Sequence, residues 1–275
     1  MISPRHEYWR DALLLPGETD PVESGLRELA DYFDISRDEA RQRCLTALAD
    51  SKREWESSAR KTPDQIADFY RGAVSYLFEH LWWHVTDVET NSANVEIMAY
   101  ARQLGAMEYL DFGSGIGANA ILFARGGLRV TLADISGAML DFARWRLARR
   151  GLAATYIDLN RSSLPAERFD LISAVDVFEH LPDPALTMRQ LGEALRIGGH
   201  LVFNYRAGKD PERPMHLLPS ARPIERAVRR SGLSVSSDAP AELGRLDLHV
   251  VERTIRDRSP LSQWWRRACN RREAR

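Results

Sequence analysis

An α/β fold is predicted from this sequence: a seven-stranded, mostly parallel sheet with helices on both faces, preceded by an all-α extension. After Gly105, short apolar runs rich in β-branched and aromatic residues alternate with helical stretches such as 136–150 and 184–195. Continuous apolar runs separated by helices are typical of parallel strands that are buried on both faces. The expected strands are residues 107–112, 128–133, 154–157, 169–175, 200–205, 233–237 and 246–254, and the last two would form an antiparallel edge.

The first hundred residues carry helix signals and no strand alternation. A capping box at 36–39 (Ser-Arg-Asp-Glu) predicts a helix start, and Leu45 and Leu48 supply apolar positions in the helix that follows. A second start is expected at 62–65, where a proline occupies the first helical position. Over 66–81, apolar residues recur every three or four positions, which predicts one amphipathic helix.

This change of pattern divides the chain into a helical extension or cap at 1–104, an α/β domain at 105–255 and a basic tail at 256–275. The tail places several arginines beside Trp264 and Trp265. A basic contact with a membrane or RNA would use such residues, but a solvated terminus or a helix packed on the body is favoured.

Charge and composition limit the partners that the chain can have. The 275 residues carry a formal net charge of -1, so no overall field would recruit nucleic acid or an anionic membrane. Cys44 and Cys269 fit no metal or redox spacing and suggest a reducing compartment. The first residues do not read as a signal peptide, and the apolar runs are too short to span a bilayer. A cytoplasmic protein with no nucleic-acid partner and no stable membrane association is expected.

A glycine-rich turn lies between the first expected strand and a helix, in the run Leu-Asp-Phe-Gly-Ser-Gly-Ile-Gly at 110–117. Gly113, Gly115 and Gly117 permit positive φ and let a ligand approach the backbone closely. The helix N-terminus beyond them offers N–H groups without helical partners. Taken alone, the spacing also satisfies the loose pattern of nicotinamide and flavin sites.

Three acidic residues follow one another at the ends of the first three expected strands. Asp111 precedes the glycines, where a carboxylate suits a ligand's ammonium group and is awkward beside a pyrophosphate. Asp134 ends the second strand, where it can accept both hydroxyls of a ribose. Asp158 ends the third strand and could receive an adenine amino group. One such acid would mean little, but the ordered series of glycines and acids is specific.

With these motifs, residues 107 to about 205 resemble the class I S-adenosylmethionine-dependent methyltransferases, which have a Rossmann-like fold. The glycine loop resembles the family's first motif, and Asp134 and Asp158 resemble its ribose and adenine acids. The run 169–184, which ends in Glu-His-Leu-Pro-Asp-Pro, resembles the fourth-strand motif, and 195–201 resembles the glycine turn before strand five. The resemblance does not extend to residues 1–104.

The resemblance implies that the domain at 105–255 binds S-adenosylmethionine and releases S-adenosylhomocysteine. The cofactor-binding residues that it implies are Asp111, Gly113, Gly115, Gly117, Asp134, Ile135, Asp158, Leu159 and Asp176.

Candidate catalytic residues cluster after the fourth and fifth strands. Glu179 and His180 follow strand four, and His216 lies in a proline-bounded segment that can return over the same sheet edge. One histidine could act as a base for a protonated acceptor. The spacing of Asp176, Glu179, His180 and His216 also resembles a divalent-cation site in some members of the superfamily, and such a metal would orient a hydroxyl acceptor. A loop feature without a metal remains the simpler interpretation.

The acceptor class follows mainly from absent motifs. The fourth motif lacks the Asn-Pro-Pro-aromatic sequence that is used to methylate exocyclic amines of bases and amide nitrogens. Neither cysteine lies in the core of the α/β domain. A small metabolite or peptide natural product, methylated on oxygen or nitrogen, is expected. Tyr70, Trp82 and Trp83 of the extension are candidates for an aromatic pocket wall. The adjacent tryptophans cannot share one helical face, so one of them is the better candidate.

Two other functions use the same motifs. A nicotinamide-dependent oxidoreductase could use the glycine turn, but it leaves Asp111 and Asp158 unexplained. A non-catalytic scaffold with this fold usually shows eroded glycines or a lost ribose acid, and both are intact in this chain.

Overall fold

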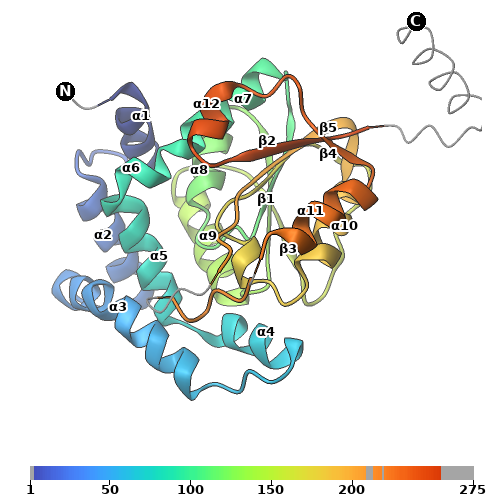
Figure 1. Ribbon diagram of the computed structural model, residues 1–275. Helices are drawn as coiled ribbons and strands as arrows, with labels where there is room; N and C mark the ends of the chain where they lie inside the picture. Colours follow the sequence, from blue (N-terminus) through green and yellow to red (C-terminus); the bar gives the residue numbers. More distant parts are fainter. Residues whose placement is uncertain (1–2, 209–212, 219, 255–275) are drawn as a thin grey trace, which may run out of the picture.

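A single seven-stranded sheet forms the centre of the protein, with the extension packed to one side (Figure 1). The computed structural model describes residues 3–208, 213–218 and 220–254. The sheet order is β3-β2-β1-β4-β5-β7-β6, and β7 runs antiparallel to β5 and β6 while the other pairs are parallel. The predicted fold class is therefore confirmed. The strands are β1 (Glu108–Phe112), β2 (Arg129–Asp134), β3 (Thr155–Asp158), β4 (Phe169–Ala174), β5 (Leu195–Phe203), β6 (Leu233–Val235) and β7 (His249–Arg253).

Helices cover both faces because neighbouring strand residues point to opposite sides of the sheet. Tyr109 and Leu171 belong to the core beneath one set of helices, and Leu110 and Ile172 belong to the core beneath the other. The first set comprises α8 (Ala118–Arg125), α9 (Gly137–Arg149) and α12 (Ala241–Arg245). The second set comprises α10 (Pro184–Ala194) and α11 (Arg222–Arg230).

The extension is helical, as predicted, and two of its predicted starts carry the expected caps. The hydroxyl of Ser36 accepts the N–H of Glu39 at 3.1 Å, and the hydroxyl of Thr62 accepts the N–H of Gln65 at 3.3 Å. The helices are α1 (Pro4–Leu13), α2 (Pro21–Phe33), α3 (Arg37–Ser57), α4 (Pro63–Gly72), α5 (Ser75–Thr86), α6 (Val88–Asn91) and α7 (Ala93–Gln103).

One detail of the helical pattern was predicted wrongly. The single helix expected over 66–81 is broken between α4 and α5 at Ala73, whose ψ of 90° leaves the helical region. Gly72 has a low helix propensity, and the break lets α4 and α5 pack on different neighbours. Leu45 and Leu48 are 56% and 42% exposed, because α3 buries smaller residues and Trp55 on its other face.

The ends of two strands also differ from the prediction. β5 begins at Leu195, five residues before the expected His200, because Leu195 already pairs with Phe169 of β4. β7 begins at His249 instead of Leu246, because the preceding residues form helix α12 and a left-handed turn at Asp247 (φ 60°). The basic tail at 256–275 lies outside the described residues.

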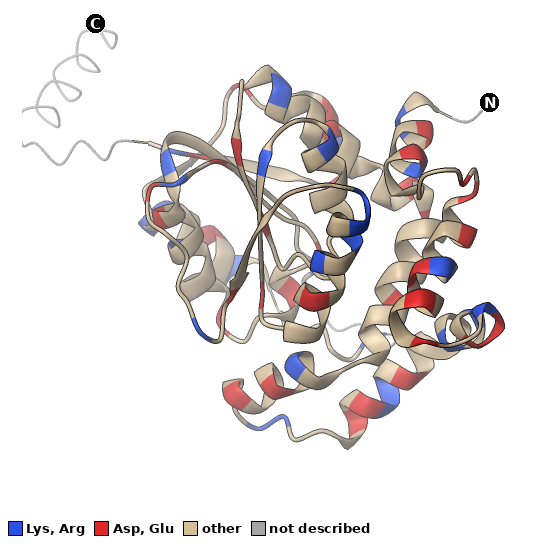
Figure 2. Ribbon diagram, turned by 180° about the vertical axis from the view of Figure 1, so that it is seen from behind, with Lys and Arg blue, Asp and Glu red and all other residues tan. Residues whose placement is uncertain are grey.

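The extension shares one hydrophobic core with the sheet domain, including Trp9 of α1 and Leu81 of α5. A buried ion pair also joins them: Glu28 of α2 binds Arg146 of α9 at 2.9 Å and also pairs with Arg150. Figure 2 shows acidic and basic residues intermixed along the extension helices, in keeping with the near-zero net charge. Within the described ranges, no helix is both long and apolar enough to cross a membrane.

Candidate active site

The glycine loop joins β1 to α8 and has positive φ at each of its three glycines, 68° at Gly113, 49° at Gly115 and 74° at Gly117. A Cβ on Gly113 would lie 2.6 Å from Val177, and one on Gly115 would lie 2.9 Å from Nδ1 of His80. These two glycines allow other parts of the chain to approach the loop closely. Side chains at both positions are therefore excluded by backbone strain and by lack of space.

Gly117, the third glycine of the loop, packs against the helices and the sheet. A Cβ there would lie 3.0 Å from Ala143 and 3.2 Å from Leu132, inside the packing between α8, α9 and the sheet. Gly117 is also the N-cap residue of α8, where it adopts the left-handed conformation. It is absent from the lining of both site cavities described below. The structure therefore places Gly117 in helix packing.

Asp134 holds the glycine loop from the end of β2. One carboxylate oxygen accepts the N–H of Gly115 and the other accepts the N–H of Ser136, both at 2.8 Å. Asp134 is buried, and that burial raises its pKa above the usual value even though the two N–H groups favour the carboxylate. Because it also lines a cavity, this acid can support the loop and meet a ligand at once.

The other two acids of the predicted series lie outside the cavity linings. Asp111 is buried beneath the loop, and burial raises its pKa to about 7. One of its oxygens accepts the hydroxyl of Ser173 at 3.4 Å, and the other has no hydrogen-bond partner. Asp158 turns outward to the amide of Asn160 at 2.7 Å and to Arg161 at 3.2 Å.

A first cavity of about 490 Å³ opens beside the glycine loop and reaches the ends of β2, β3 and β4. Six of the predicted cofactor-binding residues line it, and so does Tyr70 of the extension. Sequence reasoning missed several further apolar and polar lining residues. The predicted residues are Gly113, Gly115, Asp134, Ile135, Leu159 and Asp176, and the missed ones include Ser136, Met139, Leu164, Val177 and Thr187.

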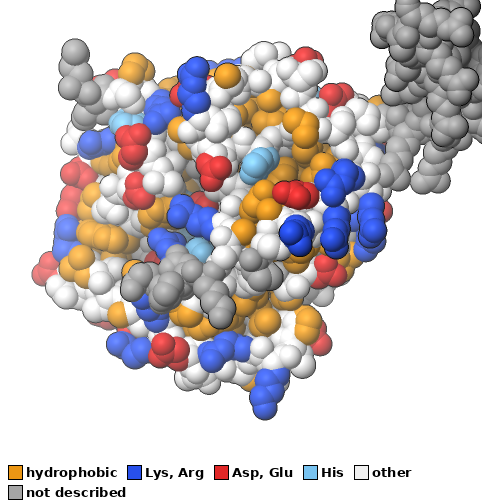
Figure 3. Space-filling view, in the orientation of Figure 1, with side chains coloured by type: hydrophobic (Ala, Val, Ile, Leu, Met, Phe, Trp, Pro, Cys, Tyr) orange, Lys and Arg blue, Asp and Glu red, His pale blue; other side chains and the backbone are white. Residues whose placement is uncertain are grey.

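A second cavity, of about 570 Å³, lies between the extension and the carboxyl edge of the sheet. Trp82 and Trp83 both contribute to its lining, as do the exposed leucines of α3 and two arginines, Arg206 and Arg213. On the face drawn in Figure 3, basic side chains and a histidine gather between the extension and the sheet domain. The two cavities adjoin, since both are lined by Tyr76, His80, Gly113, Gly115, Asp176 and His180.

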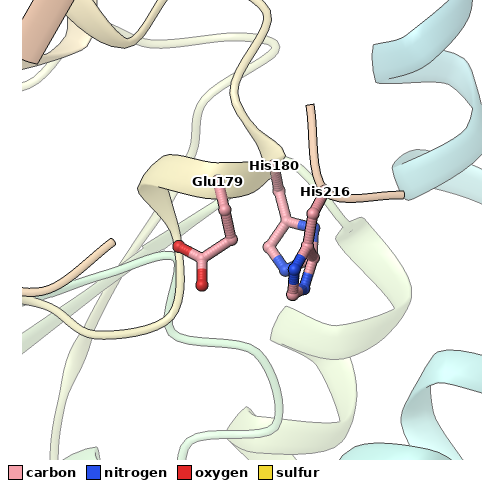
Figure 4. A group of neighbouring side chains, drawn as sticks. All are labelled: Glu179, His180 and His216. Atoms are coloured by element: carbon pink, nitrogen blue, oxygen red, sulfur yellow. The ribbon is translucent and has the colours of Figure 1, made fainter. Parts of the chain in front are cut away.

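Glu179, His180 and His216 come together at this junction, as predicted from their topology. The first two lie on the short helix η1 (Phe178–His180) after β4, and the two imidazole rings lie 4.9 Å apart (Figure 4). One ligand atom from each of the three residues lies within 4.8 Å of the others. Asp176, which we expected in the same group, lies outside it. Its backbone has φ 53° and its carboxylate accepts the amide of Asn204 at 2.9 Å.

The surroundings of this cluster determine its protonation. Burial raises the pKa of Glu179 to about 7, and one of its carboxylate oxygens has no partner. Burial and the neighbouring histidines lower the pKa of His180 to about 3, so its ring is neutral near pH 7. The hydroxyl of Tyr70 donates to the carbonyl of Met215 at 3.2 Å and lies 2.9 Å from Nδ1 of His180. That arrangement favours hydrogen on Nδ1 and leaves a lone pair on Nε2.

His80 was missed by the sequence analysis although it lines both cavities. Burial lowers its pKa to about 4, so it is neutral near pH 7. The apolar pattern over 66–81 concealed it, because that pattern follows the buried face of the helix. The signal that could have found it is the spacing of Tyr76, His80 and His84, which places three polar rings on one face of α5.

Comparisons with known proteins agree with this geometry. A family model described as "Methyltransferase domain" matches residues 74–258. The chain is 29% identical over 133 residues to the ubiquinone biosynthesis O-methyltransferase of Stutzerimonas stutzeri, covering 46% of this chain and 57% of that protein. It is 25% identical over 176 residues to the protein of the same name from Nitrosospira multiformis, covering 61% of this chain and 73% of that one.

A solved structure supports the fold. Magnesium protoporphyrin IX methyltransferase from Synechocystis, with bound S-adenosylmethionine, superposes with a TM-score of 0.51 at 17% identity, over 71% of this chain and 99% of that one. With the family model covering well over half of its residues, this chain belongs to the class I, Rossmann-like family of S-adenosylmethionine-dependent methyltransferases.

Proposed function

We propose that this protein transfers a methyl group from S-adenosylmethionine to a hydroxyl oxygen of a small molecule held in the second cavity. The observation that carries this proposal is the junction of the two cavities. One cavity is bounded by the glycine loop and Asp134, the other by aromatic and apolar side chains of the extension, and Glu179, His180 and His216 lie beside the point where they meet. The O-methyltransferases among the relatives support oxygen as the methylated atom.

The residues around the first cavity fit the cofactor of the family. The carboxylate of Asp134 faces a cavity of suitable size and can accept ribose hydroxyls. Ile135, Met139 and Leu164 provide an apolar lining for a flat base. Asp111 lies beneath the loop, outside the lining of both cavities, and one of its buried oxygens has no hydrogen-bond partner. Its carboxylate would favour an ammonium group bound above the loop. The nicotinamide alternative gains no support from the family match.

When bound, S-adenosylmethionine supplies an activated methyl group, so the protein has mainly to align the acceptor and exclude water. Tyr76, Trp82 and Trp83 provide aromatic surface for an apolar acceptor in the second cavity. A hydroxyl acceptor arrives protonated and therefore gains from a nearby proton acceptor or cation.

The cluster at 179, 180 and 216 can assist in two ways. Its carboxylate and two imidazoles could hold a divalent cation that lowers the pKa of the acceptor hydroxyl. Without a metal, the carboxylate of Glu179 or an imidazole of the pair would take the proton directly. Both versions place the reacting hydroxyl next to the unpartnered oxygen of Glu179.

The test measures transfer of a labelled methyl group from S-adenosylmethionine to a panel of phenols and catechols, with the matched anilines as controls for nitrogen acceptors. We expect turnover with hydroxylated compounds and a loss of about 10²- to 10⁴-fold in rate in Glu179→Gln, His180→Ala or His216→Ala. Abolition by EDTA with recovery in Mg²⁺ identifies the metal version, and EDTA-insensitive turnover identifies the direct base.

Exclusive methylation of the anilines would contradict the choice of oxygen. An EDTA-insensitive enzyme whose three variants keep full activity would contradict both versions of the cluster's role. Binding of S-adenosylhomocysteine to each variant is the control that separates loss of catalysis from loss of cofactor binding, because His180 lines both cavities, whereas Glu179 and His216 line only the second.

A further inference from the structure

The wall of the second cavity is apolar on the side of the extension. Helices α3 and α5 contribute Leu45, Leu48, Trp82 and Trp83 to its lining. Both leucines are exposed, so part of this apolar surface faces the open side of the cavity. A flat, apolar part of an acceptor would gain free energy by covering the leucines and by packing on the tryptophan rings.

The opposite side of the same cavity is basic (Figure 3). The segment that connects β5 to α11 contributes Arg206 and Arg213, together with His216 of the cluster. The positive charges of both arginines oppose the rise that burial causes in the pKa of Glu179. Arg213 has the same effect on the pKa of Glu79. Two guanidinium groups therefore lie near the corner where the acceptor hydroxyl is proposed to react.

The carboxyl groups in this lining are engaged by neighbours of their own. Asp87 caps α6, Glu79 accepts a serine hydroxyl from α3, and Asp176 accepts an asparagine amide. The carboxylate of Asp176 lies 3.9 Å from Nε of Arg206, which is too long for a hydrogen bond, and Arg206 makes no closer ion pair with the described residues. A guanidinium has five N–H donors in a planar fork that matches the two oxygens of a carboxylate.

We propose that the acceptor is an aromatic hydroxy acid, whose carboxylate binds Arg206 and Arg213 while its ring lies against the leucines and tryptophans of the extension. This inference rests on the proposed hydroxyl transfer and names the class of its acceptor. A carboxylate with one negative charge suits the cavity better than a phosphate with two, because Asp176 and Glu179 in the same lining repel additional negative charge. Binding at the acid would orient the ring so that its hydroxyl faces Glu179.

The test measures acceptor binding to the complex with S-adenosylhomocysteine by calorimetry. 3,4-Dihydroxybenzoate and 3,4-dihydroxybenzamide have the same ring and hydroxyls, and only the benzoate carries a negative charge. We expect the benzoate to bind about 10- to 100-fold more tightly than the benzamide, the effect of hydrogen bonds to a charged group. Arg206→Met and Arg213→Met should each reduce this preference by about 10-fold, because methionine keeps an unbranched side chain without the charge.

Three controls separate acceptor recognition from other effects. Arg245→Met removes an exposed arginine of α12 that lies outside both cavity linings, and it should leave the preference for the benzoate intact. S-adenosylhomocysteine alone should bind Arg206→Met and Arg213→Met as it binds the unaltered protein, because neither arginine lines the first cavity. The matched 3,4-dihydroxyphenylphosphonate should bind more weakly than the benzoate, because its second negative charge is repelled.

Equal binding of the benzoate and the benzamide to the unaltered protein would overturn the proposal, and so would tighter binding of the phosphonate. Weaker binding of S-adenosylhomocysteine to both arginine variants would assign the arginines to the cofactor instead of the acceptor. Transfer of a labelled methyl group to the benzoate tests the reaction separately. Preferential binding of the benzoate without methylation of its hydroxyls would contradict the proposed function and would still support the acid-binding site.

Discussion

The imidazole of His80 lies directly against Gly115, so close that a Cβ on the glycine would be 2.9 Å from Nδ1 of the ring. This contact joins the extension to the cofactor loop at the junction of the two cavities. A side chain at residue 115 would collide with His80, so the close approach of α5 to the loop depends on a glycine at this position.

Gly115→Ala should impair binding of S-adenosylhomocysteine by about 10-fold or more, because a side chain there is strained at φ 49° and displaces His80. Calorimetry measures the loss. Gly137→Ala is a matched control, since nothing lies within 4 Å of a Cβ at that position in the first turn of α9. An affinity in Gly115→Ala equal to that of the control would show that the close contact is unimportant.

Asp134→Ala should weaken S-adenosylhomocysteine by about 2 to 3 kcal/mol, because it removes a charge-assisted acceptor for the ribose hydroxyls. It also frees the N–H groups of Gly115 and Ser136, which the carboxylate holds at 2.8 Å. The measurement is isothermal titration at pH 7.5. Unchanged affinity for S-adenosylhomocysteine would show that Asp134 does not bind the cofactor.

Asp111→Asn should make the free protein more stable than the unaltered one at pH 8 but not at pH 4. Burial raises the pKa of Asp111 from its ordinary value of 3.8 to about 7, so the unfolded chain loses this proton first as the pH rises. The protein therefore loses stability between about pH 4 and 7, and the asparagine variant lacks that loss. Urea unfolding of both proteins at the two pH values gives the difference, and parallel pH profiles would contradict it.

The same variant should bind S-adenosylhomocysteine more weakly, because an amide cannot neutralise the ligand's ammonium. Greater stability together with weaker binding is the combined outcome that distinguishes a ligand-binding acid from one that serves only the fold. If Asp111→Asn binds S-adenosylhomocysteine equally well or more tightly, the carboxyl of Asp111 serves only the fold and does not bind the ligand.

Glu28→Ala should lower the free energy of unfolding by about 3 to 5 kcal/mol, because it leaves two buried guanidinium groups without their carboxylate. Glu28 is completely buried, and its partner Arg146 also donates to the carbonyl of Ile116 in the glycine loop at 3.0 Å. Glu39→Ala, which breaks an exposed pair with Arg43, should cost less than about 1 kcal/mol. If urea unfolding shows a similar loss of free energy of unfolding for the two variants, the buried pair stabilises the fold no more than the exposed pair does.

Several features of the fold and site could be predicted from the sequence because each depends on neighbours along the chain. The alternation of apolar runs and helical stretches predicted the seven strands, since burial on both faces imposes that pattern locally. The caps at Ser36 and Thr62 depend on residues three positions apart. The glycine loop and Asp134 occur at strand ends, and the common direction of parallel strands brings strand ends to one edge of the sheet.

Tertiary packing alone decided the features that depend on distant residues. The packing of Gly117 against Ala143 of α9 depends on residues far apart in the chain, and no local pattern indicated it. The apolar periodicity predicted one helix that runs through Ala73. In the structure the helix is interrupted there, because α4 and α5 pack on different neighbours. His80 meets Gly115 although 34 intervening residues separate them, and no local pattern encodes such a contact. The sequence thus determined the sheet and the cofactor loop, and the docking of the extension decided which side chains complete the site, because that contact is set by complementary surfaces far apart in the chain.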